Sequence, residues 1–167
     1  MSLLLTGGDF NRATLKTPTG MKLTRPTSGK VRQALFNVLR GSFESADALD
    51  LYAGSGAVGF EALSRGARRV VLVERHPAAF RVLEANRRTL VERGAAADRM
   101  ELVREDARAY CAARAAAPEG ARFALVFADP PFGQDFTGLA DAVRPLLAPG
   151  GTAVIEFPAR NPPDFAA

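Results

Sequence analysis

From Asp47 onward, short apolar runs alternate with segments of helical periodicity. Apolar runs typical of buried strands cover residues 48–52, 68–74, 100–106, 123–129 and 151–157. Helices are predicted between them, over residues 56–65, 77–93, 107–116 and 136–147. Because parallel strands require a crossover connection, this alternation predicts a mostly parallel twisted sheet with helices on both faces. In such a Rossmann-like α/β fold, ligands bind beyond the carboxyl ends of the strands.

The N-terminal segment is predicted to form an arm. Two short extended pieces around residues 7–8 and 17–20 indicate a β-hairpin, and we assign residues 1–26 to this arm. Residues 27–167 follow as the α/β part. The chain of 167 residues is long enough to bury one core, so we expect a single domain overall.

A helix is predicted directly after the arm, beginning at Thr27 or Ser28 and ending at Gly41. Its apolar positions at helical spacing are Val31, Leu35, Val38 and Leu39.

Positive charge is concentrated at the N-terminal end. The net charge is +4 and the pI about 9.8, yet residues 1–40 hold seven Lys or Arg side chains against one acid. The rest of the chain holds 15 basic and 17 acidic residues. Such a distribution favours contact with a nucleic acid, the alternative being a solvated arm without a partner. The basic residues that we predict to contact it are Arg12, Lys16, Lys22, Arg25, Lys30 and Arg32.

Several classes of protein are disfavoured. One cysteine, Cys111, cannot build a disulfide framework and suits a reducing cytoplasm. One cysteine and one histidine, His76, do not suffice for a structural zinc site, so we expect no metal. The apolar runs are too short to span a bilayer, and residues 1–5 lack the basic flank of a signal peptide.

A glycine-rich loop follows the first strand of the α/β part. In "LDLYAGSGAVGFEAL", Gly54, Gly56 and Gly59 form G-x-G-x-x-G, and Glu74 follows Gly54 by 20 residues. This spacing fits a dinucleotide-binding loop in which the acid binds a ribose, although a tight turn is the alternative. An acid there suits any ribose-bearing ligand, so NAD and S-adenosylmethionine both remain open.

Two further acidic residues distinguish between NAD and S-adenosylmethionine as the ligand. Asp50 lies beside the glycine loop, where it would repel a pyrophosphate but suit an ammonium group. Asp106 follows the third strand, where it can accept a hydrogen bond from an adenine amino group, cap the next helix, or do both. Three acids at three strand ends favour S-adenosylmethionine over NAD.

The fourth strand ends in an unusual corner, "FALVFADPPFG". Proline lacks the N–H, so Asp129, Pro130 and Pro131 offer acceptors and few donors, with Phe132 beside them. These four residues are the predicted catalytic group: Asp129 and the Pro130 carbonyl would hold an exocyclic NH₂ for methylation, and Phe132 would stack on the base. A Pro-rich loop with a helix-capping Asp is the alternative.

With these residues in view, the chain resembles the bacterial 16S ribosomal RNA guanine-N2 methyltransferases. "TRPTSGKVRQALFNVL" is similar to that family's L-R-P-T-x-x-x-V-R-E-x-L-F-N segment, and "LDLYAGSGAVGFEALSRGA" to its L-D-L-F-A-G-S-G-x-L-G-x-E-A-L-S-R segment. "FADPPF" is similar to the family's D-P-P-F/Y motif, and "GGDFNRATL" matches its G-G-x-x-R-G-R-x-L arm only in part. The resemblance covers residues 7–157 and implies a class I methyltransferase fold.

The resemblance also implies roles for individual residues. The implied cofactor-binding residues are Asp50, Ala53, Gly54, Ser55, Gly56, Glu74, Arg75, Asp106, Ala107 and Asp129. Residues 50–56 would cradle the methionine part, Glu74 would bind the ribose hydroxyls, and Asp106 with Ala107 the adenine. The target guanine would lie against residues 129–132. The RNA side of the site would be lined by Arg25, Pro26 and Thr27.

These observations predict a cytoplasmic, monomeric enzyme that methylates the N2 amine of a guanine in 16S rRNA and releases S-adenosylhomocysteine. The substrate would be free RNA or a small-subunit assembly particle. An adenine-N6 methyltransferase on RNA or DNA is the alternative within the class; an NAD-dependent oxidoreductase and a non-catalytic RNA-binding protein are alternatives from other classes. Members of the family continue past the fifth strand with a further hairpin, so this strand is expected to be an edge here or the chain to be shortened.

Overall fold

The main sheet of the described residues is parallel throughout. The structure, a computed structural model, describes residues 2–18, 28–117, 122–131 and 136–157. Their main sheet consists of β3 (Asp47–Leu51), β4 (Arg69–Val73), β5 (Met100–Val103), β6 (Phe123–Ala128) and β7 (Leu147–Ile155), in the order β5-β4-β3-β6-β7. The predicted parallel α/β sheet is confirmed. Its strand order reverses between β3 and β6, which is where such sheets bind ligands.

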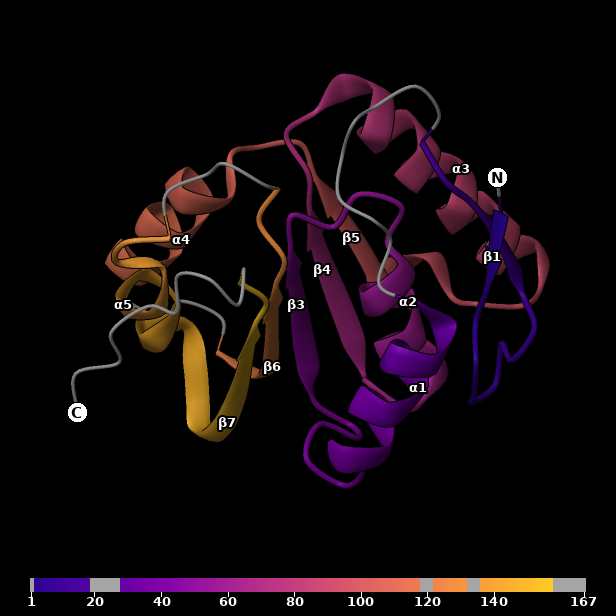
Figure 1. The fold of residues 1–167 in the computed structure, drawn as a ribbon, viewed down its shortest axis with the longest axis horizontal. Coiled ribbons are helices and arrows are strands. Elements are labelled where there is room, and N and C mark those ends of the chain that lie inside the picture. The colour runs from indigo at the N-terminus through magenta and orange to yellow at the C-terminus, as the bar shows by residue number, and fades with distance from the viewer. Residues whose placement is uncertain (1, 19–27, 118–121, 132–135, 158–167) are drawn as a thin grey trace.

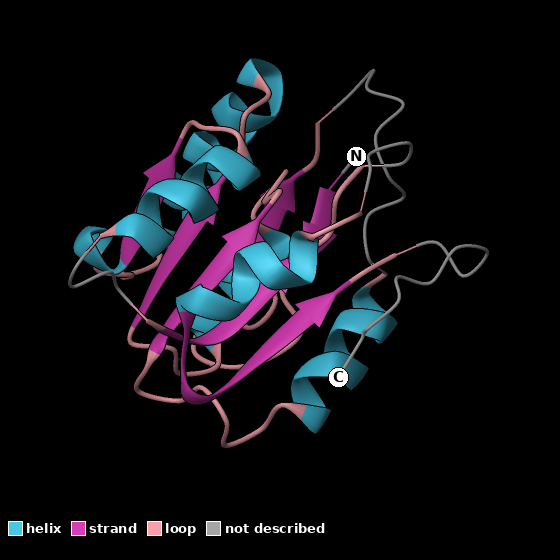
Figure 2. Cartoon of the chain, turned by 90° about the vertical axis from the view of Figure 1, so that its left-hand side faces the viewer, coloured by secondary structure: helices cyan, strands magenta, loops and turns pink. Residues whose placement is uncertain are grey.

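Helices cover both faces of the sheet, as predicted. On one face lie α1 (Gly29–Val38), α2 (Ala57–Ser64) and α3 (Pro77–Glu92), and on the other lie α4 (Ala107–Ala116) and α5 (Leu139–Val143) (Figure 1). Side chains alternate along each strand, so Ala48 packs toward the first group of helices and Leu49 toward the second. Figure 2 shows the main strands running in one direction, which brings their carboxyl ends to one edge.

Local signals in the sequence explain where the helices begin. The Ser28 hydroxyl accepts a hydrogen bond from the Val31 N–H and caps α1. The helix α3 starts with Pro77 behind the cap His76, whose Nδ1 accepts from the Ala78 N–H. Proline is favoured at a first helical position because its missing N–H would have no partner there.

The buried face of α1 differs from the prediction. Val31 and Val38 are 57% and 83% exposed, whereas Arg32 and Phe36 are buried. The other two apolar positions do face the core, since Leu39 is buried and Leu35 packs against that core; Arg32 lies on the same side because it pairs with Glu61 of α2.

The last crossover also differs from the predicted helix over 136–147. The helix α5 ends at Val143 and gives way to a 3₁₀ turn, Arg144–Leu146. Pro145 explains the break, since it cannot donate an α-helical hydrogen bond and its ring clashes with the preceding turn. The strand β7 then begins at Leu147 instead of residue 151, and a bulge interrupts its pairing with β6 between Phe123 and Leu125.

The predicted hairpin is present, although its strands lie earlier in the chain than residues 7–8 and 17–20, and it packs against the α/β core. Its strands β1 (Ser2–Leu4) and β2 (Thr14–Lys16) pair antiparallel, and Leu15 is fully buried. Gly8 has φ +75°, and a Cβ there would lie 1.7 Å from the Ser64 carbonyl oxygen of α2. Close approach of this turn lets the Asp9 N–H donate to the same oxygen at 2.7 Å. In the described part of the chain, no helix has both the length and the apolar character needed to cross a membrane.

Candidate cofactor and substrate site

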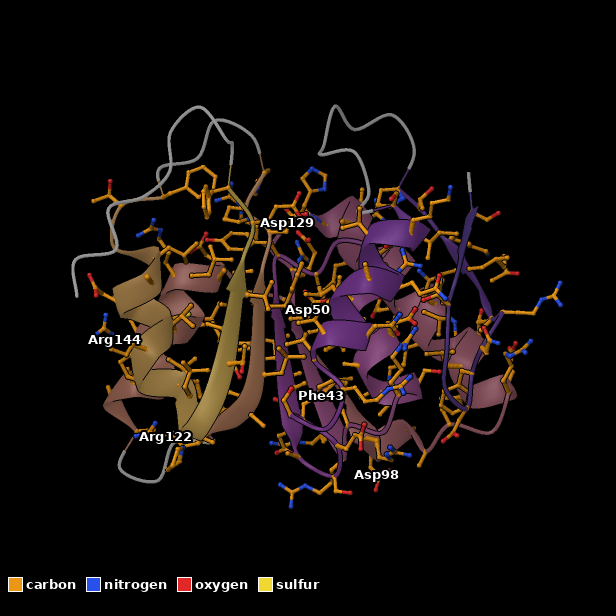
Figure 3. All side chains as sticks on the ribbon, turned by 60° about the horizontal axis from the view of Figure 1, so that its bottom comes forward. Phe43, Asp50, Asp98, Arg122, Asp129 and Arg144 are labelled. Carbon is orange, nitrogen blue, oxygen red and sulfur yellow. The ribbon has the colours of Figure 1, made fainter. Side chains whose placement is uncertain are left out.

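Four acidic residues follow four neighbouring strands at the carboxyl edge of the sheet. Asp50 lies near the end of β3, and Glu74, Asp106 and Asp129 come after β4, β5 and β6. Figure 3 shows Asp50 and Asp129 near each other at the point where the strand order reverses. Asp98 and Arg122 lie at the opposite end of the molecule in the same view. The topology therefore brings together the acids that the sequence separates by up to 79 positions.

Asp50 is the most buried of these acids. Its side chain lies on the same face of the sheet as Ala48, where α2 passes, and its Oδ2 accepts a hydrogen bond of 2.8 Å from the Gly59 N–H. The pKa of Asp50 is raised to about 7, mainly by burial and also by the nearby Asp129 and Glu74, with that hydrogen bond acting in the opposite direction. Among the described residues, no cationic side chain forms an ion pair with it. A buried carboxylate in this state is suited to receive an ammonium group.

The glycine loop is held by its neighbours. Gly56 begins α2 with φ +79°, and a Cβ there would lie 2.4 Å from the ring of Phe60, so only glycine fits. The Gly54 N–H donates to Glu74 Oε2 at 2.8 Å, which ties the loop to the end of β4. Ala53, buried beneath the loop, donates its N–H to the Val73 carbonyl at 2.9 Å.

Glu74 uses both carboxylate oxygens within the protein. Its second oxygen, Oε1, accepts from the His76 N–H at 2.7 Å. A carboxylate has about four acceptor positions, so two remain for ribose hydroxyls.

Asp106 performs the capping role that the sequence left open. Its Oδ1 accepts from the N–H groups of Arg108 at 2.9 Å and Ala109 at 3.3 Å, and Ala107 begins α4 directly behind it. Its Oδ2 pairs with Arg75 at 3.2 Å across the edge, with both side chains about half exposed. The remaining acceptor capacity of Oδ2 is available to an adenine amino group.

The predicted catalytic corner lies beyond β6. Burial, together with the negative charge of Glu156, raises the pKa of Asp129 to about 6. Pro130 is buried and Pro131 is partly buried, whereas Phe132 lies outside the described residues. Glu156 follows β7 directly, and its N–H donates to the Ala128 carbonyl at 2.9 Å. Sequence reasoning missed Glu156, although an acid at the end of "AVIEF" follows the same rule as the other strand-end acids.

The predicted RNA contacts divide into three groups. Arg12, Lys16 and Lys30 are exposed on the arm and the first turn of α1. The prediction for Arg32 is wrong. Its side chain is 1% exposed, lies 3.6 Å from the Glu61 carboxylate and donates a hydrogen bond to the Leu4 carbonyl. This buried ion pair joins α1, α2 and the arm, so the Arg32 side chain is not exposed to contact RNA. Four other predicted contacts lie outside the described residues: Lys22, Arg25, Pro26 and Thr27.

Two buried polar residues at the arm were not predicted. Glu61 is fully buried and accepts from the Thr6 N–H at 2.8 Å, the Thr6 hydroxyl at 2.7 Å and Arg65 at 2.8 Å. Asn86 is also fully buried and lies between the arm and the glycine loop. The sequence signal that could have identified Glu61 and Asn86 is that each is a polar residue at an inward-facing position of an otherwise apolar helix face.

The chemistry of the edge follows from its donors and acceptors. A buried carboxylate beside the glycine loop disfavours a pyrophosphate and favours a cation, and the two outer acids offer acceptors to hydroxyl and amino groups. No cluster of side chains able to hold a metal ion is found in residues 2–18, 28–117, 122–131 and 136–157.

Comparison with known proteins decides the family. The family described as Conserved hypothetical protein 95 matches residues 3–165. The chain belongs to this family. It is 36% identical over 145 residues to the Ribosomal RNA small subunit methyltransferase D of Escherichia coli K12, covering 87% of this chain. It is 37% identical over 125 residues to YlbH of Bacillus subtilis, which is named as a candidate rRNA methyltransferase, covering 75% of this chain.

A solved structure shares the whole architecture. The hypothetical protein TTHA0928 of Thermus thermophilus superposes with a TM-score of 0.83 at 31% identity, covering 99% of this chain and 91% of that one. A structure from Escherichia coli titled as a methyltransferase candidate, yhhF, has a TM-score of 0.70 at 30% identity, covering 89% and 76%. The fold is therefore that of the Rossmann-like methyltransferases. The chain spans 66% of the Escherichia coli K12 relative and 64% of the Bacillus subtilis one, less than two thirds of each.

Proposed function

We propose that this protein transfers a methyl group from S-adenosylmethionine to the exocyclic N2 amine of a guanine in small-subunit ribosomal RNA. The observation that carries the proposal is the pair Asp50 and Asp129, two carboxylates of raised pKa on neighbouring strands at the reversal of the strand order. One suits the ammonium end of the cofactor, and the other suits the amine to be methylated. The relatives named as ribosomal RNA methyltransferases support the substrate class.

The cofactor-binding residues would divide the ligand among the strand ends. Asp50 would hold the ammonium group, with Ala53, Gly54, Ser55 and Gly56 giving the backbone close access to the methionine part. Glu74 would bind the ribose hydroxyls through its two remaining acceptor positions. Asp106 and Ala107 would bind the adenine, with Arg75 alongside.

The target amine would be held at the corner after β6. When bound, S-adenosylmethionine would supply a sulfonium methyl group whose carbon the nitrogen lone pair can attack, so that a C–N bond forms as the C–S bond breaks, S-adenosylhomocysteine leaves, and the methylated amine releases a proton to solvent. With its pKa at about 6, Asp129 is mostly ionised at pH 7.5 and can accept a hydrogen bond from the NH₂ group. The Pro130 carbonyl would accept the second hydrogen, and Phe132 would stack on the base. Holding the amine in this way directs its lone pair and withdraws the group from conjugation with the ring.

RNA would reach this edge from the side of the arm. We propose that the basic arm, residues 1–26, contacts the phosphate backbone through Arg12 and Lys16, aided by Lys30 on α1. Lys22, Arg25, Pro26 and Thr27 complete the proposed RNA side. Such contacts are electrostatic, so binding should weaken steeply with salt. We further propose that the protein acts as a monomer in the cytoplasm and needs no metal.

The test is a transfer assay with labelled S-adenosylmethionine and undermethylated small ribosomal subunits, followed by digestion to nucleosides and mass spectrometry. We expect N2-methylguanosine. N6-methyladenosine would keep the role of the Asp129 corner and overturn the target base. Failure to methylate either free 16S rRNA or small subunits, by a protein that binds S-adenosylhomocysteine, would overturn the proposal.

A further inference from the structure

A buried side-chain amide joins the arm to the glycine loop. Asn86 lies on the inward side of α3, and none of its surface is exposed. Its Oδ1 accepts from the Lys16 N–H at 2.8 Å, and its Nδ2 donates to the Lys16 carbonyl at 2.9 Å. The same Nδ2 donates its second hydrogen to the Ser55 carbonyl at 2.8 Å. One side chain thus bonds two segments that lie 39 positions apart in the sequence.

The pairing with Lys16 is of the kind that a neighbouring strand would make. Both backbone groups of Lys16 point away from β1 at this position and are satisfied by one amide. Burying an amide costs free energy unless its hydrogen bonds are made, and here both donors and the acceptor are used. An apolar side chain would fill the same space without this requirement. The amide therefore serves the two segments that it bonds.

The glycine loop depends on such outside support. Ser55 lies between Gly54 and Gly56, which have φ +56° and +79°, conformations that are available to glycine but not enforced by it. Two bonds from other elements hold this stretch: Glu74 accepts from the Gly54 N–H, and Asn86 donates to the Ser55 carbonyl. Glu74 reaches the loop from β4, whereas Asn86 reaches it from the helix that also holds the arm.

We propose that Asn86 is a positioning residue that couples the arm to the cofactor loop. Cofactor binding stabilises the loop, and RNA binding at Lys16 stabilises the arm. Both ligands favour the arrangement in which the amide bonds both segments, so each should raise the affinity for the other by the same factor. This inference rests on the proposed function, because it requires that the loop binds S-adenosylmethionine and the arm binds RNA.

The test compares Asn86→Ala with Thr6→Val. Thr6→Val removes the hydroxyl that bonds Glu61 and Arg65, so it loosens the arm at a point that makes no bond to the loop. Calorimetry gives the Kd of S-adenosylhomocysteine with and without 16S rRNA, after circular dichroism has shown that both variants are folded. We expect RNA to tighten binding severalfold in the unmodified protein. Asn86→Ala should weaken binding about tenfold, as loss of a buried hydrogen bond allows, and should abolish the effect of RNA.

Thr6→Val should leave the Kd within about twofold and keep the effect of RNA, because its lost bonds do not reach the loop. An Asn86→Ala variant in which RNA still tightens binding would overturn the inference. Loss of this RNA effect in Thr6→Val as well would also overturn the inference, because the coupling would then depend on the general stability of the arm and not on Asn86.

A second measurement needs no variant. The Lys16 N–H is bonded to Asn86, so its hydrogen exchange reports the opening of the arm. We expect S-adenosylhomocysteine to slow this exchange at least threefold in the unmodified protein. Unchanged exchange at Lys16 with the ligand bound would overturn the inference alone. Failure of the protein to bind the ligand at all would overturn the proposed function and the inference with it.

Discussion

The two ends of β3 each carry a buried carboxylate, but among the described residues only the one at the amino end is paired with cationic side chains. Asp47, at the start of the strand, pairs with Arg68 at 2.9 Å and Arg69 at 3.1 Å. Asp50, three positions later on the same strand, has a pKa raised to about 7 by burial and by the nearby Asp129 and Glu74, although the hydrogen bond that it accepts from the Gly59 N–H opposes this rise. At the amino edge the charge is compensated within the protein. At the carboxyl edge it is not, and an arrangement of that kind costs stability that a cationic ligand can restore.

The largest expected effect belongs to the carboxyl edge. Asp129→Ala should lower the rate of methyl transfer by about 100-fold or more, because the amine loses a charged acceptor that is already in place. The Kd of S-adenosylhomocysteine should change less than about threefold, since Asp129 is proposed to hold the substrate amine. Single-turnover assays and calorimetry measure the two quantities. Asp47→Asn is the matched control, and it should retain the full rate per folded molecule; an unimpaired Asp129→Ala enzyme would contradict the role of this carboxylate.

The next effect is a pH dependence of cofactor affinity. Asp50 must be ionised to bind an ammonium group, and in the free protein its pKa is about 7. The Kd of S-adenosylhomocysteine should therefore rise as the pH falls below 7, by up to about tenfold per pH unit. Asp50→Asn should bind weakly and show a much flatter profile between pH 5.5 and pH 8, as measured by calorimetry. A profile in the unmodified protein that is flat over this range would contradict the assignment.

The stabilities of two matched variants should change in opposite directions. Asp47→Asn should lower the free energy of unfolding by about 1–2 kcal/mol, because it removes a charge paired with two arginines. Asp50→Asn should raise it at pH 8, because it removes an uncompensated buried charge.

The pH dependence of the second change has a definite sign. The folded-state pKa of Asp50 lies above the ordinary value of 3.8, so ionisation costs the folded state stability as the pH rises from about 4 to about 7. The advantage of Asp50→Asn should thus be full above pH 7 and vanish near pH 4. Urea unfolding of the ligand-free proteins at pH 8 and at pH 4 measures this difference in the free energy of unfolding. If Asp50→Asn lowered the free energy of unfolding at pH 8, the result would contradict the statement that the charge of Asp50 is uncompensated whereas that of Asp47 is compensated.

The smallest effect is expected at Arg75. Its ion pair with Asp106 is exposed, with the two side chains 55% and 42% accessible, so water and salt screen it. Arg75→Ala should change the free energy of unfolding by less than about 0.5 kcal/mol, because Asp106 keeps its capping bonds to α4. The same urea titration measures it, and a loss above about 1 kcal/mol would show that this pair stabilises the edge as Asp47 does the other.

Most of the fold could be predicted because its signals are local. Hydrophobic periodicity located each strand of the sheet, and Ser28, Pro77 and Asp106 marked the starts of three helices. The error at residues 136–147 was avoidable, because Pro145 is a local signal against a continuous helix. Strand-end acids could be grouped into one site because parallel strands end at one edge, a rule of topology that holds without side-chain coordinates.

The other errors concern partners that are distant in the sequence. The sequence predicts a surface position for Arg32, since nothing near it in the chain shows that Glu61, 29 positions later, is buried against it. Asn86 was missed because its bonds to Lys16 and Ser55 depend on how three elements pack together. Glu156 was missed because its effect on Asp129 depends on β7 pairing with β6.

The sequence by itself determined the type and order of the elements, the position of the glycine loop and the residues that end the strands. These are set by backbone sterics, periodicity and capping, which act over a few residues. Only the tertiary structure decided which charges are compensated. Asp47 and Asp50 are the same residue type on one strand, yet one meets two arginines and the other meets two acids. Burial and charge–charge distance produce that difference, and both arise only when segments far apart in the chain pack together.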